Sequence, residues 1–206
     1  MTLWLAGPAE TLCLDFANTR YWRGMPQPVD ELGSSDELLA WCAAKAAIPA
    51  DRIDALKARW RAAPDEADAV LAAALARREA IYRLFHGIAA SGEAPFLELA
   101  ELNAGFAAAP PRRVIEPGPG GFGWRLETEE LDLLTPVLWS AADLLVSRRR
   151  LARVKHCANE QCQYLFLDDS KSGNRRWCSM SACGNRAKAH RHYARHRASG
   201  AGSAST

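Results

Sequence analysis

The sequence has no hydrophobic run long enough to suggest a membrane span. Its longest helical apolar stretch, Leu131–Val146, is interrupted by Asp132 and Asp143, whereas a spanning helix needs about 20 largely apolar residues. The first residues carry no Lys or Arg ahead of their apolar positions, which argues against a secretory signal. We therefore expect a cytoplasmic protein in a reducing compartment, where thiols bind metal ions rather than form disulfides.

The common catalytic motifs are also missing. The chain contains no GxSxG, HExxH, P-loop or dinucleotide-binding pattern. The Gly-rich segment 118–121 lacks the following helix that a phosphate cradle requires, so it predicts a turn. No internal repeat is visible. These absences favour a binding protein over an enzyme.

Charge is distributed unevenly along the 206 residues, although the composition is that of a soluble globular protein, with 49% hydrophobic and 24% charged residues. The formal net charge is only +2, but residues 148–197 contain 13 Lys and Arg against 3 Asp and Glu. Such asymmetry indicates two regions with different partners. We divide the chain into a domain over residues 1–150, a basic module over 151–198 and a small polar tail, 199–206, that is expected to be disordered.

Cysteine is scarce, with six residues, yet four of them follow a regular pattern. They form two pairs with four residues inside each pair and fifteen between the pairs: Cys157, Cys162, Cys178 and Cys183. This spacing is typical of a structural zinc site with four thiolate ligands. The alternatives are four unrelated buried thiols, or replacement of one ligand by a histidine that we otherwise expect in solvated helix or loop: His156, His190, His192 or His196. Cys13 and Cys42 are expected to be buried hydrophobes.

The module around these cysteines is predicted to be treble-clef-like. Cys157–Cys162 would form a knuckle, followed by a hairpin with strands at residues 164–167 and 175–177. Five helical residues advance about 500°, so the second cysteine pair would diverge by roughly 140° on one continuous helix. The first cysteine of that pair must therefore precede a helix that runs to about Arg197, with Ser179 or Ser181 near its cap. Because so short a segment buries little apolar surface, zinc would supply the missing stability.

The N-terminal region predicts a mainly helical α+β domain. Apolar residues alternate in Leu12–Ala17, which predicts a short strand, and a loop rich in Pro and Gly follows from Trp22 to Gly33. Residues 112–115 and 122–126 predict a β-hairpin. Helices are expected over residues 34–47, 50–62, 66–90, 95–107 and 129–150, the last with an alternative start at Thr135-Pro136.

Arg78 interrupts an otherwise apolar stripe on the long helix expected over residues 66–90. A buried guanidinium needs an acceptor, and Asp15, on the polar side of its predicted strand, is the candidate partner. Asn18 and Arg20 follow closely in the chain. These four residues form either a structural bridge or the floor of a candidate pocket for a small anionic effector.

Two stretches resemble a known family. Cys183–Arg186 spells C-G-N-R and, with Arg175–Met180 ahead of it, resembles the CGNR zinc finger. Leu12–Thr19 resembles the opening of the ABATE domain, which is found upstream of that finger. The family is described as stress-induced transcriptional regulators. The resemblance implies Zn²⁺ as cofactor, the four paired cysteines as its ligands, and a role in transcription regulation and the stress response.

Metal ligands within a basic segment make nucleic acid the first partner to consider. The expected contacts are Arg175, Arg176, Arg186, Lys188, Arg191 and Arg195. The alternatives are that the first three neutralise the dianionic zinc–thiolate centre, and that the helix face is merely solvated. Since one finger offers limited contact area, a homodimer or the Arg148–Arg150 run would extend it, although that run also suits a helix C-terminus.

The sequence therefore predicts a zinc-containing DNA-binding protein that regulates transcription. Its N-terminal domain would sense an effector or mediate oligomerisation. Two alternatives stay open: a zinc module that binds RNA or protein, and an enzyme that acts on a small anionic substrate in the N-terminal domain while the finger only stabilises it.

Overall fold

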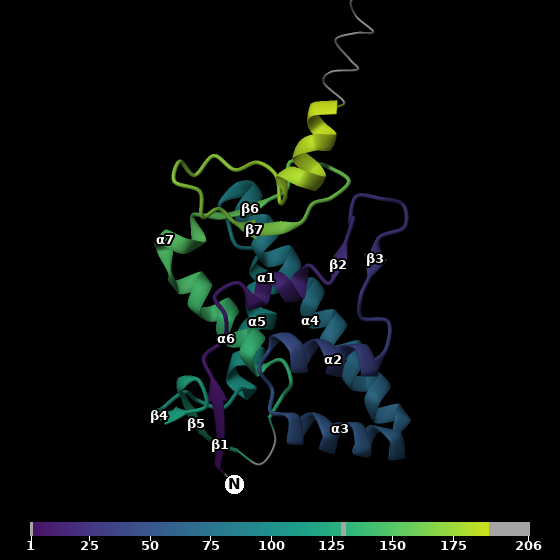
Figure 1. The fold of residues 1–206 in the computed structure, drawn as a ribbon, viewed down its shortest axis with the longest axis vertical. Helices are drawn as coiled ribbons and strands as arrows, with labels where there is room; N and C mark the ends of the chain where they lie inside the picture. Colours follow the sequence, from purple (N-terminus) through teal and green to yellow (C-terminus); the bar gives the residue numbers. More distant parts are fainter. Residues whose placement is uncertain (1, 129–130, 190–206) are drawn as a thin grey trace, which may run out of the picture.

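The computed structural model describes residues 2–128 and 131–189, and Figure 1 shows their arrangement. The helices are α1 (Leu12–Ala17), α2 (Ser35–Lys45), α3 (Ala50–Ala62), α4 (Pro64–Ser91), α5 (Phe96–Ala108), α6 (Thr135–Val146), α7 (Arg148–Leu151) and a π-helical turn, η1 (Met180–Gly184), which continues as α-helix to residue 189. The strands are β1 (Thr2–Ala6), β2 (Arg20–Tyr21), β3 (Val29–Asp30), β4 (Val114–Gly118), β5 (Gly121–Glu127), β6 (Val154–His156) and β7 (Leu165–Leu167). The fold is mainly helical α+β, as predicted.

The 28-residue helix α4 is the central element. Pro64 occupies its first turn, where a missing N–H leaves no partner unsatisfied, and Gly92 ends it in the left-handed conformation at φ 79°. Helices α1, α2, α3 and α5 contact α4, and so do strands β6 and β7. In Figure 1 α4 runs from α3 at one end of the molecule to β6 and β7 near the other. It therefore links the N-terminal helices to the C-terminal segment, residues 153–189, which we term the finger segment.

The strand predicted over Leu12–Ala17 is wrong, because this segment forms helix α1. Every residue of α1 except Asp15 is buried, so apolar side chains find partners on both sides and their alternation does not identify one face. Hydrogen bonds within the helix satisfy the backbone, for example from the Asn18 amide to the Leu14 carbonyl at 2.9 Å. The short strand of the domain is instead β1, which the sequence did not predict.

The predicted hairpin is confirmed as β4 and β5. These strands and β1 form an antiparallel sheet in the order β1-β5-β4. Trp4 of β1 explains two of its glycines: a Cβ on Gly118 or Gly123 would lie only 2.3 or 2.5 Å from the Trp4 ring. The indole Nε1 of Trp4 donates to the Glu116 carbonyl at 3.2 Å, which fixes the ring on the hairpin.

The other helices largely follow their predicted bounds. The predicted start of α2 is confirmed, because the Ser34 hydroxyl accepts from the Glu37 amide at 3.2 Å, and the Glu37 carboxylate accepts from the Gly33 amide, one residue before the cap, at 2.7 Å. The helix predicted over 129–150 is divided: α6 begins at the alternative start, Thr135, and α7 begins after Ser147. The predicted loop after Trp22 contains the short strand β3, which pairs with β2.

One hydrophobic core extends from the N-terminal helices into the finger segment. It contains Phe16 of α1 and Leu84 of α4 together with Val154, Leu165 and Leu167 of β6 and β7. The expectation that this short segment buries little apolar surface therefore needs correction, because it shares the core of its neighbour. No helix among the described residues is long and apolar enough to cross a membrane.

Candidate metal centre and nucleic-acid interface

Four sulfur atoms come together in the finger segment. Those of Cys157, Cys162, Cys178 and Cys183 all lie within 4.8 Å of one another. The Cys162–Cys178 and Cys178–Cys183 sulfur distances are 3.6 and 3.8 Å. A tetrahedral ion with metal–sulfur bonds of about 2.3 Å requires sulfurs about 3.8 Å apart. The cluster therefore has the dimensions of a tetrathiolate metal site.

The first cysteine pair lies on the predicted knuckle, between β6 and β7. The Cys157 amide donates to the Tyr164 carbonyl, and the Cys162 amide donates to the Asn159 carbonyl, both at 2.8 Å. The side-chain nitrogen of Asn159 also lies 3.5 Å from the Cys183 sulfur, where it can donate to a thiolate. The turn thus aims two thiols at one point and orients a third.

The second pair meets the helix as predicted. Cys178 precedes the helical turn η1 and Cys183 lies within it. Ser179 is the cap, since its hydroxyl accepts from the Ala182 amide at 3.3 Å. A Cβ on Gly184 would lie 2.7 Å from the Met180 sulfur, so the glycine of the C-G-N-R motif lets the turn close tightly.

The predicted return strand, residues 175–177, does not form. Strand β7 pairs instead with β6, in the antiparallel register Val154–Leu167. The Arg175 amide, which would be needed for such a ladder, donates at 3.0 Å to the carboxylate of Asp168. That carboxylate is fully buried and also accepts from Lys155 Nζ at 2.6 Å. The turn after β7 is therefore held by a buried carboxylate, which prevents pairing across a second hairpin.

Hydrogen bonding within the cluster favours the ionised form of one thiol. A hydrogen bond from Cys178 lowers the pKa of the Cys162 thiol to about 5, and the same bond raises the pKa of Cys178 above its usual range. Burial raises the pKa of Cys183 to about 11. Four thiolates would repel one another, and a divalent cation bound among them would offset that repulsion.

The two remaining cysteines are buried and do not belong to the sulfur cluster. Burial raises the pKa of both Cys13 and Cys42 to about 12, so they are protonated at neutral pH, as expected for buried hydrophobes. His156 does not join the sulfur cluster, because its ring packs against that of His86 with centroids 4.8 Å apart. The candidate ligands His190, His192 and His196 lie outside the described residues.

The finger segment is docked on the N-terminal domain through several polar contacts. Asn18 makes two hydrogen bonds to the main chain of Leu165. The Tyr82 hydroxyl donates to the Gln163 carbonyl at 3.1 Å, and the Gly24 amide donates to the Gln161 carbonyl at 3.2 Å. These contacts reach the knuckle, Gln163 and β7 from the end of α1, from α4 and from the loop after β2, so the N-terminal domain fixes the orientation of the cysteine cluster.

Two family models match the chain in this order. The ABATE model, described as "Putative stress-induced transcription regulator", matches residues 10–148, and the CGNR zinc finger model matches residues 153–196. The chain belongs to the ABATE family and carries a CGNR zinc finger. The resemblance inferred from its sequence is thereby confirmed. Neither family model describes an enzyme. A comparison with curated proteins finds no match.

The cations predicted to contact nucleic acid have different surroundings in the CGNR finger. Arg175 lies over the Phe166 ring, 4.6 Å from its centroid, and donates to the main-chain carbonyls of Trp177 and Cys178. Arg186, the last residue of the C-G-N-R motif, lies over the ring of Trp22 in the ABATE domain, 4.7 Å from the centroid. Both side chains thus make contacts that stabilise the fold.

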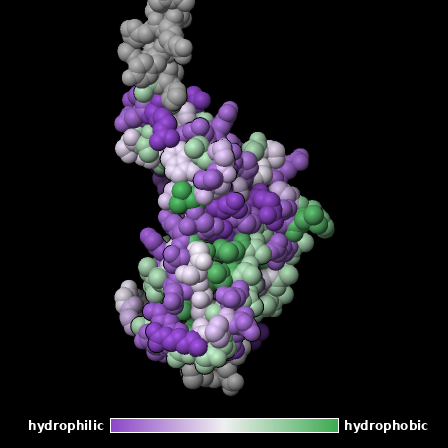
Figure 2. Space-filling view, turned by 90° about the vertical axis from the view of Figure 1, so that its right-hand side faces the viewer, coloured by the Kyte–Doolittle hydropathy of each residue, from purple (hydrophilic) through white to green (hydrophobic). Residues whose placement is uncertain are grey.

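The other predicted cations are less engaged. Arg176 is exposed, with its guanidinium 5.5 Å from the centroid of the Trp177 ring, and Lys188 is exposed on the helix that follows η1. Neither forms an ion pair within the part of the chain that the structure describes. Arg191 and Arg195 lie outside that part. Figure 2 shows a largely hydrophilic surface over the upper part of the molecule, where the finger lies.

The predicted partner of Arg78 is wrong. Its guanidinium donates to both carboxylate oxygens of Asp30, at 2.6 and 2.7 Å. It also donates to Glu79 at 3.0 Å and to the Thr19 hydroxyl at 3.3 Å. Burial opposes ionisation of Asp30, but the hydrogen bonds from Arg78 outweigh it and hold the pKa of that carboxyl below its usual range. The acceptor, Asp30, lies in the Pro- and Gly-rich loop, where no sequence pattern indicated a partner for Arg78.

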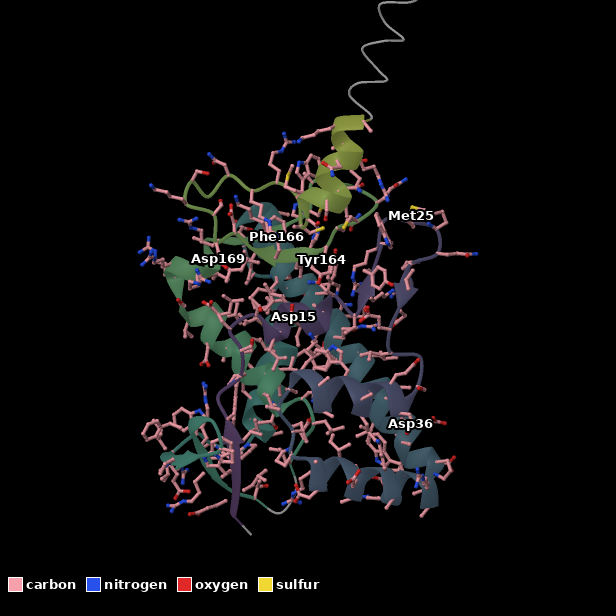
Figure 3. All side chains as sticks on the ribbon, in the orientation of Figure 1. Asp15, Met25, Asp36, Tyr164, Phe166 and Asp169 are labelled. Carbon is pink, nitrogen blue, oxygen red and sulfur yellow. The ribbon has the colours of Figure 1, made fainter. Side chains whose placement is uncertain are left out.

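The other residues of the candidate effector pocket are not brought together around an open space. Asp15 lies on α1 below Tyr164, as Figure 3 shows, and burial first and then the Asp15 charge raise the pKa of that tyrosine. Asn18 is used in docking the finger. Arg20 lies 3.8 Å from Glu79, which also binds Arg23 at 2.6 Å. Arg20 and Arg78 thus belong to an ion-pair network with Glu79, whereas Asp15 and Asn18 lie at the finger interface. An effector site formed by these four residues stays a prediction.

Proposed function

We propose that this protein is a transcriptional regulator whose CGNR finger binds DNA through its phosphates. A zinc ion held by the four cysteines would fix the shape of the finger and take no part in chemistry, because protein thiolates fill all four tetrahedral positions. The proposal includes no enzymatic activity. It rests on the exposed Lys and Arg side chains that are left once those engaged in contacts within the fold are set aside.

Half of the cations in this region serve the fold. Between residues 148 and 189 there are ten Lys and Arg and three Asp and Glu. Arg150 pairs with Glu10 at 2.5 Å and with Asp169 at 2.8 Å. Lys155 pairs with the buried Asp168. Three arginines bind carbonyls or aromatic rings: Arg153, Arg175 and Arg186.

Five exposed cations remain. They carry no ion pair within the described ranges: Arg148, Arg149, Lys171, Arg176 and Lys188. Two of the three acidic residues in the region, Asp168 and Asp169, are already paired. A solvent-exposed excess of positive charge on a rigid module attracts a polyanion and releases its counterions on binding. Arg148 and Arg149 of α7 would extend the contact beyond the finger itself.

Within the same proposal, the ABATE domain acts as the sensing or assembly module. Its route to the finger is short, because Arg78 and Tyr82 stand one helical turn apart on α4. Arg78 holds the loop that carries Asp30, and Tyr82 donates to the Gln163 carbonyl next to the knuckle. A change in the position of α4 would therefore move the finger and alter its fit to DNA.

A salt series with matched variants tests DNA binding. The metal-loaded chain is titrated by fluorescence anisotropy against duplex DNA, single-stranded DNA and RNA at about 50 and about 200 mM salt. Arg176→Ala with Lys188→Ala removes two exposed cations of the finger. Arg61→Ala with Lys57→Ala removes the same residue types from α3.

The finger variant should weaken duplex binding and reduce the slope of log affinity against log salt by about 2, while the α3 variant leaves both unchanged. Tighter binding to RNA than to duplex would replace DNA by RNA as the partner. Absence of binding to all three polymers at low salt would refute nucleic-acid binding and leave a protein partner.

A further inference from the structure

One aromatic side chain of the ABATE domain lies against the metal centre. Trp22, in the turn after β2, is half-buried and packs on the cluster that contains three buried cysteines: Cys157, Cys162 and Cys183. The rings of Tyr164 and Trp177, which also pack on this cluster, belong to the finger itself. A residue from outside the finger therefore completes the wall around the cysteine cluster.

The backbone of Trp22 adopts a conformation that bulky residues rarely accept. Its φ is 56°, in the left-handed region that favours glycine. A residue keeps such a conformation only where the surrounding contacts hold it there. The Met25 amide donates to the Trp22 carbonyl at 2.9 Å and closes the turn, and the Arg186 guanidinium lies 4.7 Å from the centroid of the indole ring. The indole is therefore held against both the cysteine cluster and the last residue of the C-G-N-R motif.

The turn that carries this indole is fastened to α4 and to the knuckle. Arg23 donates to the Glu79 carboxylate on α4 at 2.6 Å, and its guanidinium lies 3.7 Å from the centroid of the Tyr82 ring. The next residue, Gly24, donates its amide to the Gln161 carbonyl at 3.2 Å. Figure 1 shows the connection between β2 and β3 reaching the level of the finger. Three consecutive residues thus contact the cysteine cluster, α4 and the knuckle, so a displacement of α4 would move the indole.

We propose that Trp22 is a lid over the metal centre, through which the ABATE domain controls the access of competing metal ligands to the cysteine cluster. An apolar ring packed on metal-binding thiolates limits the access of solvent and solutes to them. Withdrawal of the ring would expose the sulfurs to chelating solutes and shorten the time for which the finger keeps its metal. Metal retention by the finger thus depends on the state of the ABATE domain, whether or not the finger contacts DNA.

Transfer of zinc from the full-length, zinc-loaded chain to an excess of chelator tests the lid. The chelator is pyridylazoresorcinol, whose zinc complex absorbs visible light, and the transfer rate is measured over a range of chelator concentrations. The slope of rate against concentration reports attack by the chelator at the metal centre. The intercept reports spontaneous loss of the metal. A lid affects the slope, whereas general instability of the finger affects the intercept.

Trp22→Gly removes the ring and suits the turn, because glycine adopts a positive φ without steric cost. The slope should rise about tenfold, the lower end of the effect of removing a neighbour of a metal ligand, and the intercept should change much less. Trp124→Ala is the control, because this half-buried tryptophan of β5 packs against the main core instead, and it should leave the slope unchanged. A wild-type slope in Trp22→Gly, or equal increases in both variants, would overturn the proposal.

If Trp22→Gly does not fold, Arg23→Gln decides, because it keeps the ring and removes the ion pair that fastens the turn to Glu79. The slope should rise severalfold in this variant. A wild-type slope would show that α4 does not hold the lid and would refute control by the ABATE domain. These measurements contain no nucleic acid, so their failure leaves the DNA proposal standing, and failure of DNA binding leaves the lid standing.

Discussion

Asn18 holds the main chain of Leu165 at both of its polar groups. The side-chain nitrogen of Asn18 donates to the Leu165 carbonyl at 2.8 Å, and the Leu165 amide donates to the Asn18 oxygen at 2.9 Å. All of these groups are buried. The side chain of Asn18, at the C-terminal end of α1, therefore takes the place of a neighbouring strand along this part of β7 and joins the ABATE domain to the finger.

Asn18→Ala should destabilise the protein by about 1–3 kcal/mol, because it leaves a buried amide and a buried carbonyl without partners. Urea unfolding measures the loss, and hydrogen exchange should become faster at Leu165. Asn103→Ala, an exposed position on α5, is the control and should stay within about 0.5 kcal/mol of wild type. Equal stabilities for the two variants would contradict a docking role for Asn18.

Gly24→Ala should separate the loop after β2 from the knuckle. A Cβ at Gly24 would lie 1.9 Å from the Glu160 carbonyl oxygen, so the Gly24–Gln161 hydrogen bond cannot persist. Forcing extra volume into a packed contact typically costs about 1–3 kcal/mol. Thermal unfolding and limited proteolysis of the knuckle report the change. Gly7→Ala is the matched control, because a Cβ there meets nothing within 4 Å, and a similar effect from both variants would refute this explanation.

Trp22 and Arg186 should be energetically coupled across the two modules. The guanidinium lies 4.7 Å from the ring centroid, and exposed cation–π pairs contribute about 0.5–1 kcal/mol. A double-mutant cycle of Trp22→Leu and Arg186→Ala, followed by unfolding free energies, measures the coupling. If Arg186 positions the finger, Trp22→Leu should also weaken DNA binding although it removes no charge. Additive effects in the cycle would remove the positioning role.

Removal of the metal should unfold the finger before the ABATE helices. Structural zinc binds finger peptides with about 10–16 kcal/mol near pH 7, and that free energy is coupled to folding. Elemental analysis should find one zinc per chain, and chelation should increase hydrogen exchange in the knuckle and η1 more than in α2. Cys183→Ser should lose the metal, whereas Cys42→Ala, with its thiol buried in the main core, should keep it. Retention of the metal by Cys183→Ser would contradict the four-thiolate site.

Asp168 should make stability depend on acid pH. Hydrogen bonds from Lys155 first, then Ser170 and the Arg175 amide, hold the pKa of this carboxyl far below its usual range. A lowered folded-state pKa contributes stability that is complete above the unfolded value of about 3.9 and falls as pH drops below it.

Asp168→Asn should therefore have a lower Tm at neutral pH, and its difference from wild type should narrow between about pH 5 and pH 2. Both proteins release the metal in acid, so comparing their Tm values at each pH removes this shared effect. Asp54→Asn, at an exposed position on α3, should show a small, constant difference. A gap between Asp168→Asn and wild type that is the same at all pH values would refute the ionic role.

Local patterns predicted much of the structure because they depend on nearby residues alone. The cysteine spacing limits how the second pair can meet a helix, and Ser179 caps that helix as expected. Ser34 and Glu37 mark the start of α2 for the same kind of reason. The Gly-Pro-Gly-Gly turn predicted the hairpin, since Gly120 and Gly121 adopt positive φ values of 80° and 139°.

Other features depended on residues far apart in the chain. A six-residue apolar segment is compatible with strand or helix, and burial of α1 on nearly all sides decides between them. Arg78 requires an acceptor, but only the folded loop places Asp30 there instead of Asp15. The partner of β7 was misassigned because the buried Asp168 carboxylate occupies the Arg175 amide.

The sequence by itself determined the cluster of four cysteines, the helix caps and the family, because these features depend on short-range spacing and local hydrogen bonding. Tertiary structure decided which cations are available to a partner. From the sequence, Arg175 and Arg186 are predicted to bind nucleic acid. In the structure they pack on the rings of Phe166 and Trp22 instead. Whether a cation serves a partner or the fold depends on its neighbours, and folding brings those neighbours from as far away in the chain as Glu10 and the loop before β3.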